Sequence, residues 1–111
     1  QANYLRNQLA LNNIPFLDSN SHIVPVMTYK SSLAKAYSKK LLEQFGIYVQ
    51  PIFYPTVPKN EARLRFTITP KHTKKDINEL INALVVIYNL KSRKESYSSL
   101  PQSQEKISAY G

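Results

Sequence analysis

The segment QPIFYPTVPKNEARLRF, residues 50–66, joins a proline-rich loop to a strand with a regular pattern. Over residues 62–68 apolar and polar side chains alternate, which is the period of a β-strand that buries one face. The apolar positions share the core face: Ala62, Leu64, Phe66 and Ile68. Arg63 and Arg65 therefore share the opposite face. The pattern predicts a strand that holds both arginines outside the core.

A helix and a strand are predicted at the start of the chain. Residues 1–13 have leucines at helical spacing and are interpreted as the end of a helix. Asn12 and Asn13 supply its stop, because asparagine tolerates the left-handed conformation. Residues 22–27 form a short apolar strand. Pro25 lacks an amide hydrogen, so this strand lies at a sheet edge or places Pro25 where no ladder bond is needed.

A second helix follows, and its boundaries are marked by capping residues. Ser31 or Ser32 is expected to cap a helix that runs to about Phe45, and Gly46 supplies its C-terminal stop. Its expected apolar face comprises Leu33, Ala34, Tyr37, Leu41, Leu42 and Phe45. Residues 47–52 are expected to form one further strand.

The third helix has the strongest apolar period in the chain. Thr73 is its expected N-cap, and Asp76 three residues later completes a variant of the capping box. The apolar stripe comprises Ile77, Leu80, Ile81, Leu84, Val85, Ile87 and Tyr88. From about residue 91 Ser, Lys, Gln and Glu dominate, so residues 91–111 are expected to form a polar tail that is flexible or docked.

The predicted fold class is α+β, a three-stranded, mainly antiparallel sheet with helices on one face. A length of 111 residues fits one small domain, which we expect to cover residues 1–90. The chain opens on Gln1 and its only methionine is Met27, so we expect it to be a piece of a longer chain. No apolar run is long enough to cross a membrane.

The composition of the chain excludes some kinds of site and favours some classes of ligand. The chain has no cysteine, which excludes a disulfide framework and a cysteine-based zinc site. Its net charge of +8 suits nucleic acid, anionic lipid or a polyanionic small molecule, or it reflects a solvated surface with lysines spread along the chain. The two histidines are far apart in sequence and suggest no metal site. His22 is interpreted as a packing or hydrogen-bonding residue, and His72 as a solvated one.

The arginine strand offers the most specific chemistry. A guanidinium is a planar fork that matches a carboxylate with two parallel hydrogen bonds, and a strand fixes the direction of the fork. Prolines stiffen the preceding loop, so Thr56 is presented with little ordering cost on binding. The alternative is a surface ion pair of Arg63 or Arg65 with Glu61. No glycine-rich phosphate loop, paired carboxylates or nucleophile elbow is present.

Three motifs in the same order resemble one enzyme family. SHIVPVM at 21–27, GIYVQPIFYPTVP at 46–58 and RLRFTITPKHT at 63–73 are similar to the C-terminal domain of the 5-aminolevulinate synthases. These belong to the α-oxoamine synthases, within the fold-type I pyridoxal-phosphate enzymes, and the resemblance covers roughly residues 1–90. The sister families of 2-amino-3-ketobutyrate ligase and 8-amino-7-oxononanoate synthase remain alternatives, although YVQPI favours the first family.

The resemblance implies an enzyme that condenses glycine with succinyl-CoA to 5-aminolevulinate, CoA and carbon dioxide, the first step of haem synthesis. Arg65 falls where the family binds the glycine carboxylate, and Thr56 where it contacts the succinyl carboxylate. Arg63 is given a structural role. The cofactor is pyridoxal 5'-phosphate, and its binding residues, including the Schiff-base lysine, are expected upstream. This segment alone is therefore expected to be inactive and to carry no catalytic or cofactor-binding residue.

The resemblance also implies a homodimer in the mitochondrial matrix or the bacterial cytoplasm, without a nucleic-acid or membrane partner. Phe53, Asn60 and Ile68 depart from residues that are frequent in the family, and Phe53 puts the hydrogen bonding of the loop in doubt. An alternative of another class is a basic module without enzymatic activity that binds polyanions. It predicts salt-sensitive binding to RNA.

Overall fold

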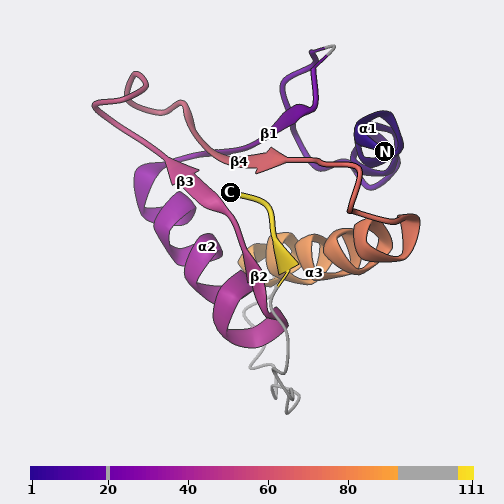
Figure 1. The fold of residues 1–111 in the computed structure, drawn as a ribbon. Coiled ribbons are helices and arrows are strands. Elements are labelled where there is room, and N and C mark those ends of the chain that lie inside the picture. Colours follow the sequence, from indigo (N-terminus) through magenta and orange to yellow (C-terminus); the bar gives the residue numbers. More distant parts are fainter. Residues whose placement is uncertain (20, 93–107) are drawn as a thin grey trace.

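Three helices lie on one face of a three-stranded antiparallel sheet in the computed structural model, which describes residues 1–19, 21–92 and 108–111 (Figure 1). The helices are α1 (Ala2–Leu11), α2 (Ser31–Phe45) and α3 (Lys74–Ser92). The strands are β1 (Ile23–Tyr29), β2 (Ile47–Tyr48), β3 (Gln50–Ile52), β4 (Ala62–Thr67) and β5 (Ser108–Ala109). The predicted fold class is confirmed.

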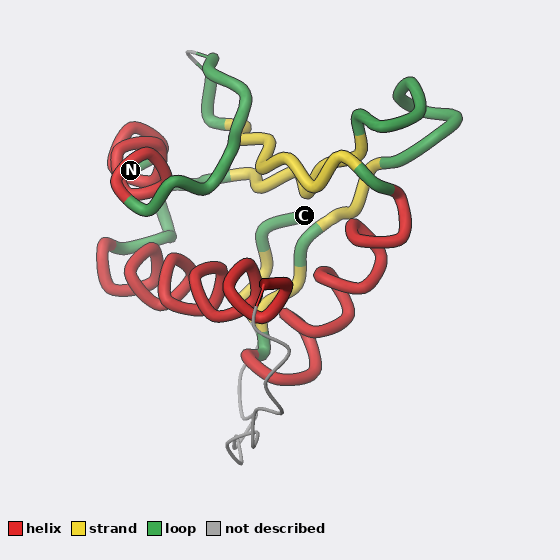
Figure 2. Tube along the Cα trace, turned by 180° about the vertical axis from the view of Figure 1, so that it is seen from behind, coloured by secondary structure: helices red, strands yellow, loops and turns green. Residues whose placement is uncertain are grey.

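Strand β4 lies at the centre of the sheet, whose order is β1-β4-β3 with both pairs antiparallel. Figure 2 shows α3 running beneath this sheet, with α1 and α2 on either side. Because side chains alternate along β4, Leu64 and Phe66 point into the space above the helices. The predicted alternation is confirmed, since Ala62, Leu64 and Phe66 are buried and the residues between them are only half-buried.

Pro25 fits the sheet without losing a ladder bond. Its carbonyl oxygen accepts a hydrogen bond from the Leu17 amide on the side away from β4, at 2.9 Å. A strand residue directs its nitrogen and its carbonyl to the same side, so the proline nitrogen faces away from β4 as well. The extended segment around Phe16 covers this outer edge through a bridge to Val26. The prediction of an edge position for this strand is confirmed.

The strand predicted over residues 47–52 is two strands, β2 and β3. Strand β3 pairs with β4, and this pairing ends where Gln50 lies opposite Arg65. Strand β2 instead pairs in parallel with β5, in register Ile47 with Ser108 and Tyr48 with Ala109. The sequence prediction was wrong here because β2 pairs with residues that lie 61 positions further along the chain.

Residues 108–111 connect the three-stranded sheet to the two-stranded sheet that β2 and β5 form. The Thr67 amide at the end of β4 donates to the Tyr110 carbonyl, and the Tyr110 amide donates to the Tyr48 carbonyl, both at 2.7 Å. Tyr110 is almost fully buried. The docked alternative therefore describes residues 108–111. Residues 93–107 lie outside the described residues.

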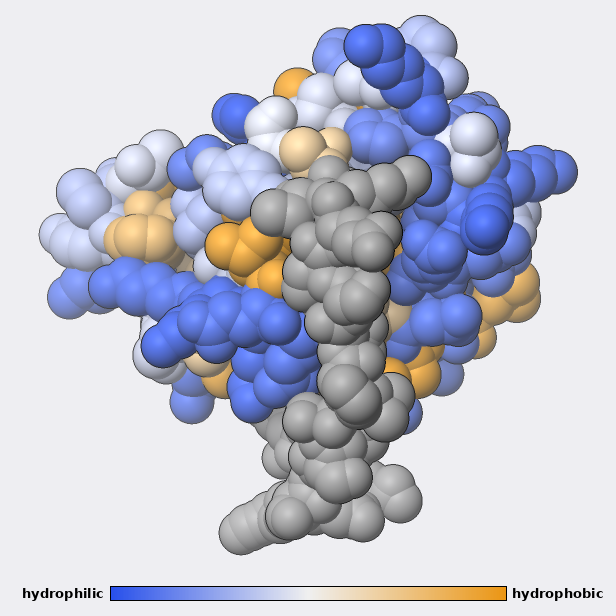
Figure 3. Space-filling model, turned by 60° about the horizontal axis from the view of Figure 1, so that its bottom comes forward, coloured by the Kyte–Doolittle hydropathy of each residue, from blue (hydrophilic) through white to orange (hydrophobic). Residues whose placement is uncertain are grey.

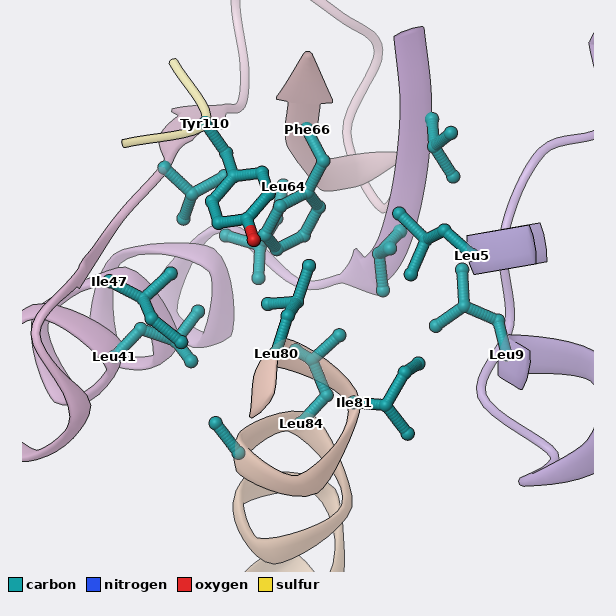
Figure 4. Close-up of a cluster of buried hydrophobic side chains, with 14 of the residues drawn as sticks. Leu5, Leu9, Leu41, Ile47, Leu64, Phe66, Leu80, Ile81, Leu84 and Tyr110 are labelled. Atoms are coloured by element: carbon teal, nitrogen blue, oxygen red, sulfur yellow. The ribbon is translucent and has the colours of Figure 1, made fainter. Parts of the chain in front are cut away.

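The core lies between the sheet and the helices (Figure 4). The largest fully buried side chains come from all three helices, from β1 and β4 and from the C-terminal segment: Leu5, Leu9, Val24, Val26, Leu41, Leu64, Phe66, Ile77, Leu80, Leu84, Ile87 and Tyr110. The predicted stripe of α3 is confirmed, with Val85 and Tyr88 partly buried at its margin. Leu42 was expected on the core face of α2 but is exposed.

Helix ends follow the predicted chemistry at three of four sites. Asn13 and Gly46 have positive φ angles, 57° and 67°. The Thr73 amide donates to the Asp76 carboxylate at 2.9 Å, and the Asp76 amide donates to the Thr73 hydroxyl at 3.1 Å, which is a reciprocal capping box. Helix α2 differs, because its N-cap is Lys30 and no side-chain bond caps it.

Gly46→Ala is expected to lower the free energy of unfolding by about 1 kcal/mol, because a β-carbon disfavours the left-handed conformation. Gly46→Asn is the matched variant, and we expect a smaller loss because asparagine tolerates positive φ. Urea unfolding followed by circular dichroism measures both. Equal stability of Gly46→Ala and the wild type would contradict the left-handed C-cap.

The outer surfaces of the helices are mainly polar. Figure 3 views the molecule from below the helices, and the visible surface is mostly hydrophilic with small apolar patches. Among the described residues, no helix is both long and apolar enough to cross a bilayer.

Candidate functional site

Arg65 lies in the middle of the central strand, on the face opposite the helices. It stands across from Pro25 on β1 and from Gln50 on β3, so a neighbouring strand flanks it on each side. Its side chain is half-buried. The backbone of the sheet therefore holds its direction, as the alternation of β4 predicted.

The guanidinium of Arg65 has no partner among the described residues. Its Nε atom is buried and makes no hydrogen bond. A buried donor without an acceptor costs about 1–3 kcal/mol, so it is usually satisfied by something. Part of this planar fork is thus held in place without a protein hydrogen-bond partner in the described residues, which suits a ligand with two coplanar oxygen atoms.

Arg63, two residues earlier on the same face, is engaged locally. Its Nε donates to the Glu61 carbonyl at 3.0 Å, and its Nη2 lies 3.5 Å from the Glu61 carboxylate. The alternative of an ion pair with Glu61 is therefore seen at Arg63, and the structural role of Arg63 stays a prediction. Such an exposed pair contributes little to stability. Arg63 thus contacts Glu61, whereas Arg65 has no protein partner in the described residues and can bind a ligand.

Thr56 lies on the loop that connects β3 to β4 and projects beyond the sheet (Figure 1). It is exposed, and its amide donates to the Phe53 carbonyl at 3.0 Å in a turn that includes the cis Tyr54–Pro55 bond. Asn60, further along the loop, has a φ of 67°, which asparagine tolerates. Within the described residues no hydrogen bond joins Thr56 to Arg65, so the structure does not unite the two predicted positions.

Two cations flank this loop. The Lys35 ammonium of α2 lies 4.7 Å from the centre of the Phe53 ring, and the Lys59 ammonium lies 5.2 Å from the centre of the Tyr54 ring. Both distances fall within the range of cation–π attraction. The loop thus has a positive rim, and this feature was not predicted from the sequence.

The two histidines differ in their surroundings. His22 is exposed, and its carbonyl accepts a hydrogen bond from the Ile68 amide. His72 was expected to be solvated, but it is half-buried and stacks on Tyr110 with ring centres 4.3 Å apart. Its Nδ1 accepts from the Thr69 amide. The prediction failed because Tyr110, which is distant in sequence, covers the ring. No cluster of metal-ligating side chains occurs in the described parts of the chain.

The family follows from a comparison of the chain with known proteins. A family model described as aminotransferase class I and II matches residues 1–84. The chain belongs to the class I and II aminotransferase family. Three relatives of this aminotransferase-family chain are named 5-aminolevulinate synthase. That of Rhizobium meliloti is 51% identical over 80 residues, which covers 72% of the chain and 20% of the relative.

The other two relatives come from a fungus and a second bacterium. The mitochondrial 5-aminolevulinate synthase of Emericella nidulans is 49% identical and covers 69% of the aminotransferase-family chain and 12% of the relative. The 5-aminolevulinate synthase of Rickettsia prowazekii is 46% identical, over 77% of the chain and 20% of the relative. The chain thus spans one fifth or less of the length of these relatives.

Solved structures show the same fold. The solved structure of SPT with the PLP internal aldimine matches this chain with a TM-score of 0.73 and 24% sequence identity. The match covers 79% of the aminotransferase-family chain and 22% of the SPT chain. Sphingomonas wittichii serine palmitoyltransferase has a TM-score of 0.72 at 20% identity, over the same two shares. At this identity the likeness concerns the fold alone.

Proposed function

We propose that this chain is the C-terminal small domain of a 5-aminolevulinate synthase that uses pyridoxal 5'-phosphate. The whole enzyme condenses glycine with succinyl-CoA and releases 5-aminolevulinate, CoA and carbon dioxide. The observation that carries the proposal is Arg65, whose guanidinium is fixed on a central strand with a buried Nε and no partner in the described residues. The similarity to synthases of bacteria and fungi supports the same reaction.

The role of Arg65 is to bind the carboxylate of the substrate glycine. Two parallel hydrogen bonds from the fork fix both the position and the rotation of a small amino acid. A lysine in its place provides a point charge without that directional match. Arg63 is less suited to this role, because its Nε and Nη2 contact Glu61.

The cofactor supplies the electron sink for bond cleavage at the α-carbon of the amino acid. The orphaned Nε of Arg65 fits a substrate carboxylate, so the contribution of this chain is to orient the amino acid. We expect the residues that hold the cofactor, including its Schiff-base lysine, in the part of the enzyme that precedes residue 1. The 111-residue chain is therefore expected to be inactive alone and to act within a homodimer of the complete enzyme.

Thr56 is proposed to contact the carboxylate end of the succinyl group. Its exposed position on a projecting loop leaves its hydroxyl accessible to a substrate that approaches from outside. No hydrogen bond links Thr56 to Arg65 in the described residues, which is consistent with separate positions for the carboxylates of the two substrates. The positive rim formed by Lys35 and Lys59 favours an anionic acyl donor at this loop.

Thr56→Val is expected to raise the KM for succinyl-CoA by about 10- to 150-fold, since one hydrogen bond to a charged carboxylate contributes about 1.5–3 kcal/mol. The KM for glycine should stay unchanged. Thr56→Ser keeps the hydroxyl and is expected to retain a KM near the wild-type value. Steady-state kinetics of the full-length wild type, Thr56→Val and Thr56→Ser give the KM values for succinyl-CoA and glycine. A KM for succinyl-CoA that Thr56→Val leaves unchanged would remove Thr56 from the site.

The reaction is tested by supplying the purified full-length protein with glycine and succinyl-CoA and detecting 5-aminolevulinate by mass spectrometry. Formation of 2-amino-3-ketobutyrate or 8-amino-7-oxononanoate from the corresponding amino acids and acyl donors, and not of 5-aminolevulinate, would assign the chain to a sister enzyme. The relatives include mitochondrial and bacterial synthases. We therefore expect the enzyme in a mitochondrial matrix or a bacterial cytoplasm.

A further inference from the structure

A second arginine, Arg6 on α1, is a buried cation. Its side chain is only 7% exposed. Nη1 donates to the Asn3 side-chain oxygen at 2.8 Å, and Nη2 donates to the Ser19 hydroxyl at 3.4 Å and to the Ser21 carbonyl. Nε is buried and makes no hydrogen bond. All the acceptors are neutral, so none of them compensates the positive charge.

No acidic side chain of the described residues neutralises Arg6. Across residues 1–19, 21–92 and 108–111 the ion pair within 4.0 Å is that of Arg63 with Glu61. Burying a charge is costly unless an opposite charge accompanies it. The buried guanidinium thus has neutral partners only and an Nε without a hydrogen bond, and an anion would neutralise its charge.

Arg6 lines a cavity of about 370 Å³ that is largely open to solvent. The cavity also has polar walls from Asn3, His22 and Thr69, and an apolar wall from Ile68. It lies between the start of α1 and the ends of β1 and β4, and it includes neither Arg65 nor Thr56. A space of this size admits a small organic anion as well as a protein side chain.

We propose that this cavity binds a carboxylate group against the guanidinium of Arg6. A carboxylate offers two coplanar oxygens, which matches the planar fork, and its charge neutralises the buried cation. Two sources supply such a group: a free small carboxylic acid, or an aspartate or glutamate side chain of another part of the longer polypeptide. The chemistry at Arg6 is the same for both.

The site is tested first with acetate and the ¹⁵N-labelled 111-residue chain. The Nε–H resonance of Arg6, assigned by its loss in Arg6→Lys, is expected to move with acetate and to saturate. We expect half-saturation at about 1–10 mM, the weak range expected of so small a ligand. Sodium chloride at equal ionic strength is the control. A resonance that stays still in acetate, or moves equally in chloride, would overturn the proposal.

The resonance of Arg65 separates this proposal from the function proposed above. Arg65 is expected to respond to acetate through its own site, and its Nε–H signal is distinct from that of Arg6. An Arg65 resonance that does not move with acetate counts against glycine binding and does not affect the proposal for the Arg6 cavity. Silence at Arg6 alone counts against the cavity and leaves the proposed reaction standing.

The two sources are separated in full-length protein that carries Arg65→Leu, which removes the competing carboxylate site. If a free acid is the ligand, acetate raises the melting temperature, and adding Arg6→Met abolishes the rise. If an acidic side chain of the same protein is the ligand, Arg6→Met lowers the melting temperature in plain buffer and acetate has no effect. Lys39→Met removes an exposed charge from α2 and is the matched control. An Arg6→Met variant that resembles the control in both measurements would refute both sources.

Discussion

Arg65→Leu in the full-length enzyme is expected to lower kcat/KM for glycine by about 100- to 10,000-fold. Two charge-assisted hydrogen bonds contribute about 1.5–3 kcal/mol each, and every 1.4 kcal/mol is a factor of ten. The loss should appear both in the KM for glycine and in kcat, because a carboxylate that is not held also leaves the reacting carbon misplaced. Steady-state kinetics with glycine as the varied substrate measure both constants.

Two variants make this result specific. Arg65→Lys keeps the charge but loses the fork, so its activity should lie between those of the wild type and Arg65→Leu. Arg63→Leu removes the neighbouring arginine of the same face, and since Arg63 is engaged with Glu61 the loss should be small. If Arg65→Leu retains the wild-type KM and kcat, or if Arg63→Leu is equally damaging, Arg65 does not bind the substrate carboxylate.

Tyr110→Ala is expected to lower the free energy of unfolding by about 3 kcal/mol, the lower end of the range for removing a buried aromatic ring. The ring lies edge-on to Phe66 with centres 5.6 Å apart and stacks on His72. Losing it leaves a void over β4 and weakens the hold of β5 on β2. Urea unfolding of the wild type and the variant, followed by circular dichroism, measures the difference.

Tyr110→Phe is the matched control, because it keeps the ring and removes only the hydroxyl. That hydroxyl donates to the Asp76 carbonyl over 3.4 Å, a long bond, so we expect a loss of at most about 1 kcal/mol. If Tyr110→Ala is as stable as the wild type, the C-terminal segment does not dock as described.

The hydroxyl of Tyr110 also makes stability depend on alkaline pH. Burial, then the charges of Asp76 and Glu79, raise its pKa above the ordinary 10.0. The folded state disfavours the phenolate, so it keeps the Tyr110 proton at pH values where the unfolded chain releases it. The free energy of unfolding therefore keeps the full contribution of this hydroxyl below about pH 10. It falls as pH rises from there toward the raised pKa. Tyr110→Phe should therefore lose less stability than the wild type between about pH 10 and pH 12.

Features set by neighbouring residues could be predicted from the sequence. Asn13 and Gly46 adopt the left-handed conformation that their chemistry permits, and Thr73 and Asp76 form the expected capping box. The position of Arg65 on the outer face follows from alternation along one strand. These features depend on spacings of a few residues, so no knowledge of distant contacts was needed.

Features set by distant partners could not be predicted. The division of residues 47–52 and the burial of His72 both depend on residues 108–111, whose polar surroundings in the sequence suggest no strand. The burial of Arg6 likewise depends on acceptors at Ser19 and Ser21, beyond the end of its helix. The division into a domain of residues 1–90 and a tail stays a prediction, although α3 continues to Ser92.

The segment that runs alongside β1 has a consequence for contacts between separate copies of the protein. An uncovered outer strand invites pairing with another chain and hence aggregation. Here the Met27 amide donates to the Pro15 carbonyl, the Pro25 carbonyl accepts from Leu17, and Pro25 itself has no hydrogen to offer. Aggregation through this margin of the sheet would require the chain around Phe16 to peel away first.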